Sequence, residues 1–176
     1  KTTIARLIAE RIGYVMEPVS AVASGVTDLK KHFEAARERT AMGQRTLLFI
    51  DEVHRFNRAQ QDVLLPVVED GTVTLVGATT ENPSFELNSA LLSRARVLVL
   101  KRLDDAALEA LLLRAEQEMG QAIPLTPEAR VQLRAMADGD GRFLLNLVEA
   151  VLGAGSRFRG AGELMGPEVL ARLVQQ

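Results

Sequence analysis

The sequence predicts an α/β fold with a parallel sheet, followed by an all-helical subdomain. Helical and strand-like patterns alternate along the first part of the chain. Within it, Thr46–Ile50 is an unbroken apolar run, typical of a central parallel strand covered by helices on both faces. No strand pattern remains after Asp104. We therefore expect an α/β subdomain over residues 1–102 and a helical subdomain over residues 103–176.

The first helix is predicted by apolar residues that recur at helical spacing and form one stripe: Ile4, Leu7, Ile8 and Ile12. Gly13 ends this helix, and Tyr14–Val19 follows as a short strand. Thr27 or Asp28 can cap the next helix, which precedes the central strand. Its inward face is expected to carry Leu29, Phe33 and Ala36.

After the central strand, Asn57 can cap a helix that runs toward Glu69. Pro66 distorts this helix, because proline has no backbone N–H to donate. Further elements are then predicted in this order: a second buried strand over Thr72–Thr80, a short helix over Asn88–Arg94 and a strand over Val97–Leu100.

The rest of the chain reads as helices with recognisable starts. Asp104 caps the first, and Thr126 followed by Pro127 begins the second. Arg142 opens a third helix, and Gly166-Pro167 begins the last. The residues expected to face inward are Ala107, Leu108, Leu111 and Leu112, then Leu144, Leu145, Leu147 and Val148, and finally Val169, Leu170 and Leu173.

Composition excludes several classes of protein. The chain has no Cys, which leaves no disulfide framework and no thiolate metal site and fits a reducing compartment such as the cytoplasm. It has no Trp and a single Tyr, which argues against an aromatic platform for stacking bases. No signal peptide or membrane-length apolar run is recognised. The net charge of −2 neither indicates nor excludes nucleic-acid binding, because local basic surfaces average out in the sum.

Two short motifs together indicate a nucleoside-triphosphatase site. Lys1-Thr2 opens a helix, as at the end of a phosphate-binding G-x-x-x-x-G-K-[ST] loop. Asp51 and Glu52 follow the central strand, where one carboxylate can hold magnesium and the other can orient a water molecule. Each motif alone has a simpler interpretation. Lys1-Thr2 could be an exposed lysine at a chain end, and Asp51-Glu52 could be a solvated acidic turn.

The glycines of a phosphate loop are absent before Lys1. We therefore expect a truncated chain that lacks the first strand and most of this loop. Without these glycines, most of the backbone N–H groups that would cradle the phosphates are absent as well.

Three further positions are ambiguous on their own. Thr79 and Thr80 end the second buried strand, and Thr79 reads simply as a β-branched strand residue. Arg94 and Arg142 each stand at the end or start of a helix, where an isolated arginine would be a surface residue.

Taken together, these motifs resemble the AAA+ ATPases, and specifically the RarA/MgsA family of replication-associated recombination proteins in the clamp-loader clade. The resemblance rests on runs that are densest between residues 45 and 104: Phe49–Asn57, Gln60–Asp62, Leu64–Pro66, Val68–Gly71, Gly77–Glu86 and Asn88–Arg94. The His-Arg-Phe-Asn and Thr-Thr-Glu-Asn-Pro-Ser-Phe segments within them are more specific than an Asp-Glu pair.

The resemblance implies a role for each matching residue. Lys1, Thr2 and Thr3 correspond to the end of Walker A and bind ATP, with Thr2 and Asp51 as ligands of Mg²⁺. The implied catalytic residues are Glu52 of Walker B, the polar sensor Thr80 and the arginine finger Arg94. Asn82 is the second candidate for the sensor, and Arg142 corresponds to the second sensor at the start of a lid helix.

It also implies ATP hydrolysis completed by a neighbouring subunit, in a protein that acts on DNA ends, gaps or forks during replication-fork maintenance, recombination and repair. A homo-oligomer, contact with single-strand-binding protein and a cytoplasmic, nucleoid-associated location follow from the same resemblance. The truncated chain is then expected to be nearly inactive alone. Candidate basic contacts to DNA are Lys30, Lys31, Arg37, Arg39, Arg45, Arg55 and Arg58, of which the last two are favoured because they follow the acidic pair.

Three alternatives remain at this point. A Holliday-junction branch-migration motor shares the threonine sensor and the lid, but the Glu81–Phe85 segment disfavours it. A non-catalytic scaffold could use nucleotide only to switch its shape. A metal hydrolase using Asp51, Glu52 and His54 would need a further ligand, and His32 is the only other histidine.

Overall fold

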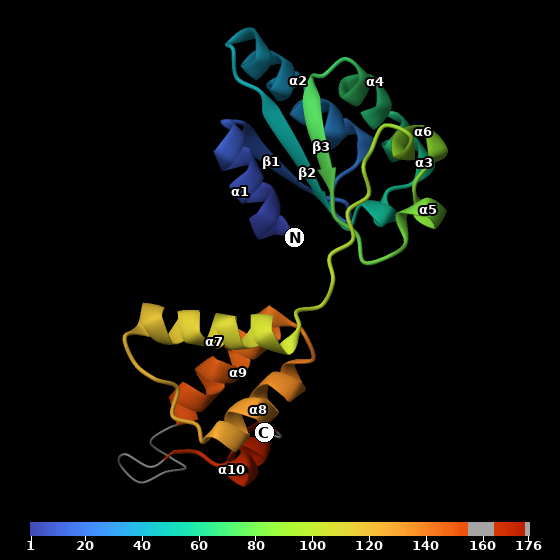
Figure 1. Ribbon diagram of the computed structural model, residues 1–176. Helices are drawn as coiled ribbons and strands as arrows, with labels where there is room; N and C mark the ends of the chain where they lie inside the picture. The colour runs from blue at the N-terminus through green and yellow to red at the C-terminus, as the bar shows by residue number, and fades with distance from the viewer. Residues whose placement is uncertain (155–163, 175–176) are drawn as a thin grey trace. The chain divides into compact units, whose positions relative to one another are not determined.

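The computed structural model describes residues 1–154 and 164–174. The chain divides into two compact units, Lys1–Leu98 and Val99–Gln176 (Figure 1). The division falls a few residues before the boundary expected from the sequence. Each unit is described by itself below, as the N-terminal unit and the C-terminal unit.

The N-terminal unit is built on a parallel sheet, as the sequence predicted, but the described sheet has three strands rather than the four expected. Its strands are β1 (Val15–Ser20), β2 (Thr46–Asp51) and β3 (Val73–Gly77), in the order β1-β2-β3. Val19 pairs with Ile50, and Ile50 pairs with Gly77. The carboxyl ends of all three strands therefore lie along one edge of the sheet.

The central strand β2 is buried on both faces, which explains its unbroken apolar sequence. Because successive side chains of a strand point to opposite faces, Leu47 and Phe49 enter one apolar cluster and Leu48 and Ile50 another. The Leu48 side of the sheet packs against α2 (Val26–Ala41).

The other face of the sheet is covered by α1 (Thr2–Ile12), but not through the predicted stripe. Its buried residues are Ala5 and Ala9, each about 1% exposed. The four larger residues Ile4, Leu7, Ile8 and Ile12 are 42–59% exposed. The prediction was wrong because it followed residue size, whereas here the small alanine side chains are the ones in contact with the strands.

The inward face predicted for α2 is confirmed, since Leu29, Phe33 and Ala36 are all buried. Its cap differs from the prediction. The helix begins after Gly25, and the side chain of Asp28 accepts a hydrogen bond from the Gly25 N–H at 3.3 Å. Asp28 thus lies in the first turn, where a carboxylate is also favoured by the helix dipole.

Asn57 caps a helix as predicted, accepting a hydrogen bond from the N–H of Gln60 at 3.0 Å. The predicted single helix is two: α3 (Arg58–Asp62) and α4 (Leu64–Glu69). The break precedes Pro66 by one turn, because the proline ring leaves the carbonyl four residues earlier without a partner.

Two short helices follow β3, namely α5 (Pro83–Glu86) and α6 (Ser89–Leu92). The strand predicted over Val97–Leu100 is absent: this segment has no strand pairing, and its four side chains are 52–82% exposed. An apolar run becomes a strand only where a neighbouring strand supplies hydrogen bonds, and no described strand lies beside this one.

The C-terminal unit is helical in its described residues, as predicted. Its helices are α7 (Asp105–Met119), α8 (Pro127–Ala137), α9 (Gly141–Ala154) and α10 (Pro167–Val174). Asp104 and Thr126 cap α7 and α8 through their side chains. The helices share one core, centred on residues such as Leu112, Leu133 and Leu144, although Leu145 is 36% exposed rather than inward. No described helix is long and apolar enough to cross a membrane.

Candidate functional site

The candidate site lies at the carboxyl edge of the sheet, where the chain leaves β2 and β3. Beyond the strands, the N–H of Ala78 donates to the carbonyl of Ile50 at 2.8 Å, and the N–H of Val53 donates to the carbonyl of Ala78 at 2.9 Å. These two bonds join the segments that follow the strands. Ligands of parallel α/β sheets bind at this edge.

The two residues of the acidic pair differ in backbone conformation and in surroundings. Asp51 is exposed, and one of its oxygens accepts the Glu52 N–H at 3.2 Å. Glu52 adopts the left-handed region, with φ 53° and ψ 45°. Few residues other than glycine adopt this conformation, and such strained residues cluster at functional sites.

Two more predicted residues lie beside this pair. The hydroxyl of Thr80 donates to Glu52 Oε2 at 3.4 Å. The amine of Lys1, from the start of α1, donates to the backbone carbonyl of Thr79. The structure therefore brings Lys1, Glu52 and Thr80 together at one edge of the sheet, although they are far apart in sequence.

Two more residues join this group, although the sequence indicated His54 only as a metal ligand and Thr79 only as a strand residue. His54 belongs to the 3-10 turn Val53–Arg55, and its Nδ1 lies 2.9 Å from Thr79 Oγ1. Its Nε2 lies 3.4 Å from Glu52 Oε2. Reading Thr79 as a plain strand residue was wrong, because its hydroxyl bonds to His54 and to the Glu81 backbone. The Asp-Glu-x-His spacing was the only signal available.

The remaining Walker A and sensor candidates have simpler surroundings. Thr2 is half-buried and Thr3 is exposed, both in the first turn of α1. Asn82 uses its side-chain oxygen to cap α5, accepting the Ser84 N–H at 3.0 Å. The Thr80 hydroxyl contacts Glu52, whereas the described hydrogen bond of the Asn82 side chain is to the backbone of α5.

The two predicted arginines lie in different units. Arg94 follows α6, is 42% exposed, and forms an ion pair with Glu69 at 2.6 Å. Its described contacts include neither Glu52 nor Lys1. Arg142 is an exposed residue at the start of α9 in the C-terminal unit, where its backbone N–H is accepted by Asp140.

The basic residues considered for DNA contact separate into paired and free groups. Arg39 is held by Glu17 at 2.7 Å and is only 24% exposed, which removes it as a candidate. Lys31 pairs with Asp28 on α2. Within residues 1–154 and 164–174, Arg55 and Arg58 are exposed and form no ion pair.

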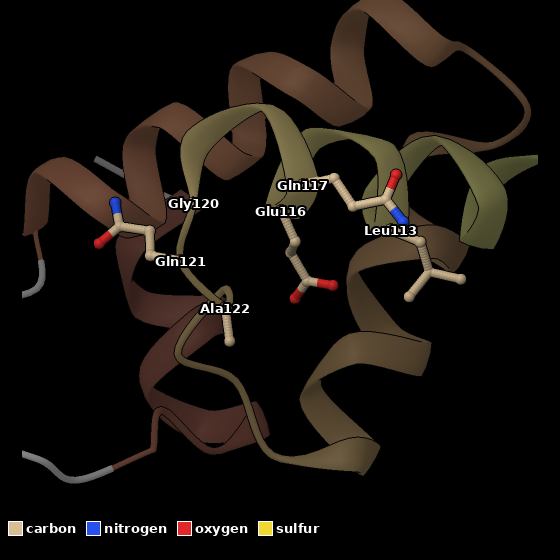
Figure 2. Close-up of a pocket in the computed structure, with 6 residues that line it drawn as sticks. All are labelled: Leu113, Glu116, Gln117, Gly120, Gln121 and Ala122. Carbon is tan, nitrogen blue, oxygen red and sulfur yellow. The ribbon is translucent and has the colours of Figure 1, made fainter.

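A hollow on the C-terminal unit does not carry this chemistry. Figure 2 shows it near the end of α7, lined by Leu113, Glu116, Gln117, Gly120, Gln121 and Ala122. The one charged group there, Glu116, is already bonded to Arg130 at 2.7 Å and to the N–H of Ile123. The hydrogen bond from Arg130 lowers the pKa of Glu116, so this carboxylate serves the packing of the helices.

The donor set at the sheet edge fits magnesium bound together with a nucleotide. In the part of the chain that the structure describes, no group of three or more His, Asp or Glu residues could hold a metal. This argues against the metal hydrolase considered above. Mg²⁺ prefers one or two protein oxygens completed by water and phosphate, and the exposed carboxylate of Asp51 can supply one.

A parallel sheet with a lysine, an acidic pair and a threonine at its carboxyl edge, followed by a helical unit, defines the class of AAA+ P-loop nucleoside triphosphatases with a helical lid. The family model "ATPase family associated with various cellular activities (AAA)" matches residues 1–103. The chain belongs to this family.

Two relatives indicate which members of the family the chain resembles. The chain is 45% identical to Replication-associated recombination protein A of Escherichia coli K12, over 98% of this chain and 40% of that protein. It is 49% identical to the protein of the same name from Coxiella burnetii, over 86% of this chain and 35% of that protein. The resemblance inferred from the motifs is confirmed, and the chain spans less than half the length of these relatives.

A solved structure agrees on the fold. The Thermotoga maritima RuvB Holliday junction branch migration motor matches 99% of this chain and 57% of its own, with a TM-score of 0.77 and 24% identity. The shared AAA+ fold explains why a branch-migration motor was a reasonable alternative from the sequence.

Proposed function

We propose that this protein hydrolyses ATP with Mg²⁺ and acts on DNA in replication-fork maintenance, recombination and repair. The observation that carries the proposal is the approach of Lys1, Glu52 and Thr80 at the carboxyl edge of the sheet. Membership of an ATPase family and relatives named for replication-associated recombination support it. The chain is 45% identical to Replication-associated recombination protein A and 24% identical to the branch migration motor, which favours the first of these functions.

Each residue has a role that its position allows. The Lys1 amine binds the β- and γ-phosphates, and the Thr2 hydroxyl and Asp51 carboxylate hold Mg²⁺, with Thr3 beside the nucleotide. When bound, Mg²⁺ neutralises charge on the phosphate oxygens. Glu52 accepts a proton from the attacking water, and Thr80 fixes the carboxylate through its 3.4 Å hydrogen bond.

Two arginines have proposed roles that rest on the family resemblance. For Arg142 this is the role of the second sensor. Arg94 acts on the ATP of a neighbouring subunit, which agrees with its exposure and with the absence of a described contact to its own Lys1 or Glu52. A single isolated chain is then nearly inactive, because an arginine supplied in trans contributes roughly 10³–10⁵ in rate in well-studied nucleotidases.

For DNA, we propose that Arg55 and Arg58 contact phosphates, since both are exposed and close in sequence to the acidic pair. Replacing both with glutamate in the intact protein should make the salt dependence of DNA binding less steep. An unchanged slope would remove them from the interface. Contact with single-strand-binding protein is proposed from the family resemblance, and a titration of the two purified proteins tests it.

Glu52→Gln tests the enzymatic function directly. Glutamine keeps the shape of the side chain but cannot accept the proton, so we expect hydrolysis by the intact protein to fall by at least about 10²-fold while ATP binding is retained. Glu34→Gln, an exposed change on α2, is the matched control. Undiminished hydrolysis would contradict the role of Glu52. Loss of hydrolysis with unchanged repair function in cells would favour a nucleotide-switched scaffold.

A further inference from the structure

The position of His54 suggests a task beyond packing. Its ring is contacted at both nitrogens, by Thr79 Oγ1 at 2.9 Å and by Glu52 Oε2 at 3.4 Å. Only 13% of its side chain is exposed. A ring held from both sides and largely removed from solvent keeps one orientation.

The hydroxyl of Thr79 bears on which nitrogen of His54 carries the proton. Its oxygen accepts the Glu81 N–H at 2.9 Å and has one proton of its own to donate. Two acceptors compete for that proton, His54 Nδ1 at 2.9 Å and the Glu81 carbonyl at 3.3 Å. The shorter contact favours donation to His54, which makes Nδ1 the acceptor.

The contact with Glu52 favours a proton on Nε2. An unprotonated Nε2 would face the carboxylate lone pair to lone pair, whereas a protonated Nε2 can donate to it. A neutral ring with its proton on Nε2 satisfies both neighbours at once. Thr79 then donates a hydrogen bond to His54 Nδ1, and the Nε2–H of His54 faces Glu52 Oε2 at 3.4 Å.

Both described contacts of the Glu52 carboxylate fall on the same oxygen. His54 and Thr80 each approach Oε2 at 3.4 Å. No described residue bonds to Oε1. One oxygen is thus held by the protein, and the other remains available to a water molecule.

We propose that His54 is a positioning residue for Glu52, with Thr79 fixing its tautomer. The Nε2–H of His54 holds Oε2, so that Oε1 is presented to the attacking water. This inference rests on the proposed ATPase function, because it assigns His54 to the orientation of the general base. His54 itself contacts neither nucleotide nor water in the reaction.

The tautomer can be tested without any nucleotide. In the intact protein labelled with ¹⁵N-histidine, the signals lost in His54→Gln identify this ring. We expect a protonated Nε2 and an unprotonated Nδ1, and we expect Thr79→Val to change this pattern. A ring protonated only on Nδ1 would overturn the proposal.

Kinetics test the positioning role. His54→Ala should lower kcat by about 10- to 100-fold, the range found when outer-shell partners are removed, with the ATP dissociation constant changed by less than about 2-fold. His54→Gln, whose amide can still donate to Glu52, should recover part of the loss. His32→Gln, a half-buried histidine on α2 that pairs with Glu17, is the control and should leave kcat unchanged.

A double variant separates positioning from general damage. In the Glu52→Gln background, His54→Ala should cause little further loss, because the group that it positions no longer acts as a base. If the losses of kcat in the two single variants add fully in the double variant, the positioning role of His54 is overturned. An unchanged kcat in His54→Ala with normal thermal unfolding overturns it as well. Neither result affects the proposed ATPase function. A wild-type protein without ATP hydrolysis would instead overturn the proposed function.

Discussion

The buried amide of Gln61 holds together the segments that surround the site. Its Nε2 donates to the carbonyls of Phe56 and Glu86, at 2.9 and 3.0 Å, and its Oε1 accepts the Asn88 N–H at 2.7 Å. Only 3% of the residue is exposed. Three backbone groups from different segments therefore depend on one side chain.

Gln61→Leu should destabilise the protein by about 2–3 kcal/mol, because leucine has similar volume but leaves one buried and two partly buried backbone groups without this partner. Urea unfolding measures the difference. The matched control is Gln44→Leu, the same chemical change at an exposed position, which should stay within about 0.5 kcal/mol of wild type. Equal effects of the two changes would contradict a structural role for the amide.

At the scale of single residues, the sequence predicted where the acidic pair lies but not which side chains lie beside it. Asp51 and Glu52 were predictable because the apolar strand before them ends in the two carboxylates. The partnership of His54 with Thr79 was not, because it depends on the left-handed turn at Glu52 and on a hydrogen bond between residues 25 positions apart. A turn of that kind is set by tertiary contacts rather than by local sequence.

At the scale of elements, periodicity succeeded where the large apolar side chains of an element are the ones packed in the core. The continuous apolar run of β2 and the inward face of α2 are examples, and both are buried as expected. It failed for α1 and for Val97–Leu100, whose large apolar side chains are exposed. Hydrophobic pattern shows that a face is apolar, but which neighbour covers it depends on packing.

Helices α7 and α8 are joined by a group of charged side chains as well as by their apolar core. Arg130 forms ion pairs with Glu109 at 2.9 Å and with Glu116 at 2.7 Å, and Arg134 pairs with Asp105 and Glu109. The hydrogen bond with Glu116 raises the pKa of Arg130, and the same bond lowers the pKa of Glu116. The charged forms of both groups are therefore favoured by folding.

The sign of this effect on acid stability follows directly. A carboxylate whose pKa is lowered in the folded state contributes stability above its unfolded value, here near the ordinary 4.5. This contribution disappears as the pH falls through the lower folded pKa. Glu116→Gln should therefore reduce stability at neutral pH and weaken the loss of stability below pH 4.5.

Thermal unfolding of wild type and Glu116→Gln across this pH range measures the effect. Glu118→Gln, at an exposed position of the same helix, is the control, since Glu118 forms no ion pair among the residues that the structure describes. If the two variants lose stability in parallel at every pH, the bond between Glu116 and Arg130 does not stabilise the packing of α7 on α8.

At the scale of the whole molecule, the proposed role of Arg94 depends on what its guanidinium contacts in the single chain. In the single chain its guanidinium is engaged by Glu69 and by the carbonyl of Ala90, and both charged side chains are partly exposed. An exposed ion pair of this kind contributes little stability. The proposed exchange of Glu69 for a phosphate on a neighbouring subunit would therefore cost little.

Mixing two inactive variants of the intact protein tests whether this arginine acts between subunits. Arg94→Ala retains Glu52 but offers no finger, whereas Glu52→Gln retains the finger but lacks the base. If the finger acts in trans, an equal mixture should recover about a quarter of wild-type hydrolysis, because one interface in four then combines both intact residues under random assembly. The double variant mixed with Arg94→Ala is the control and should recover nothing beyond its own residual rate, since no finger is present. Failure of the two single variants to complement each other, in oligomers shown to exchange subunits, would place the action of Arg94 within its own chain.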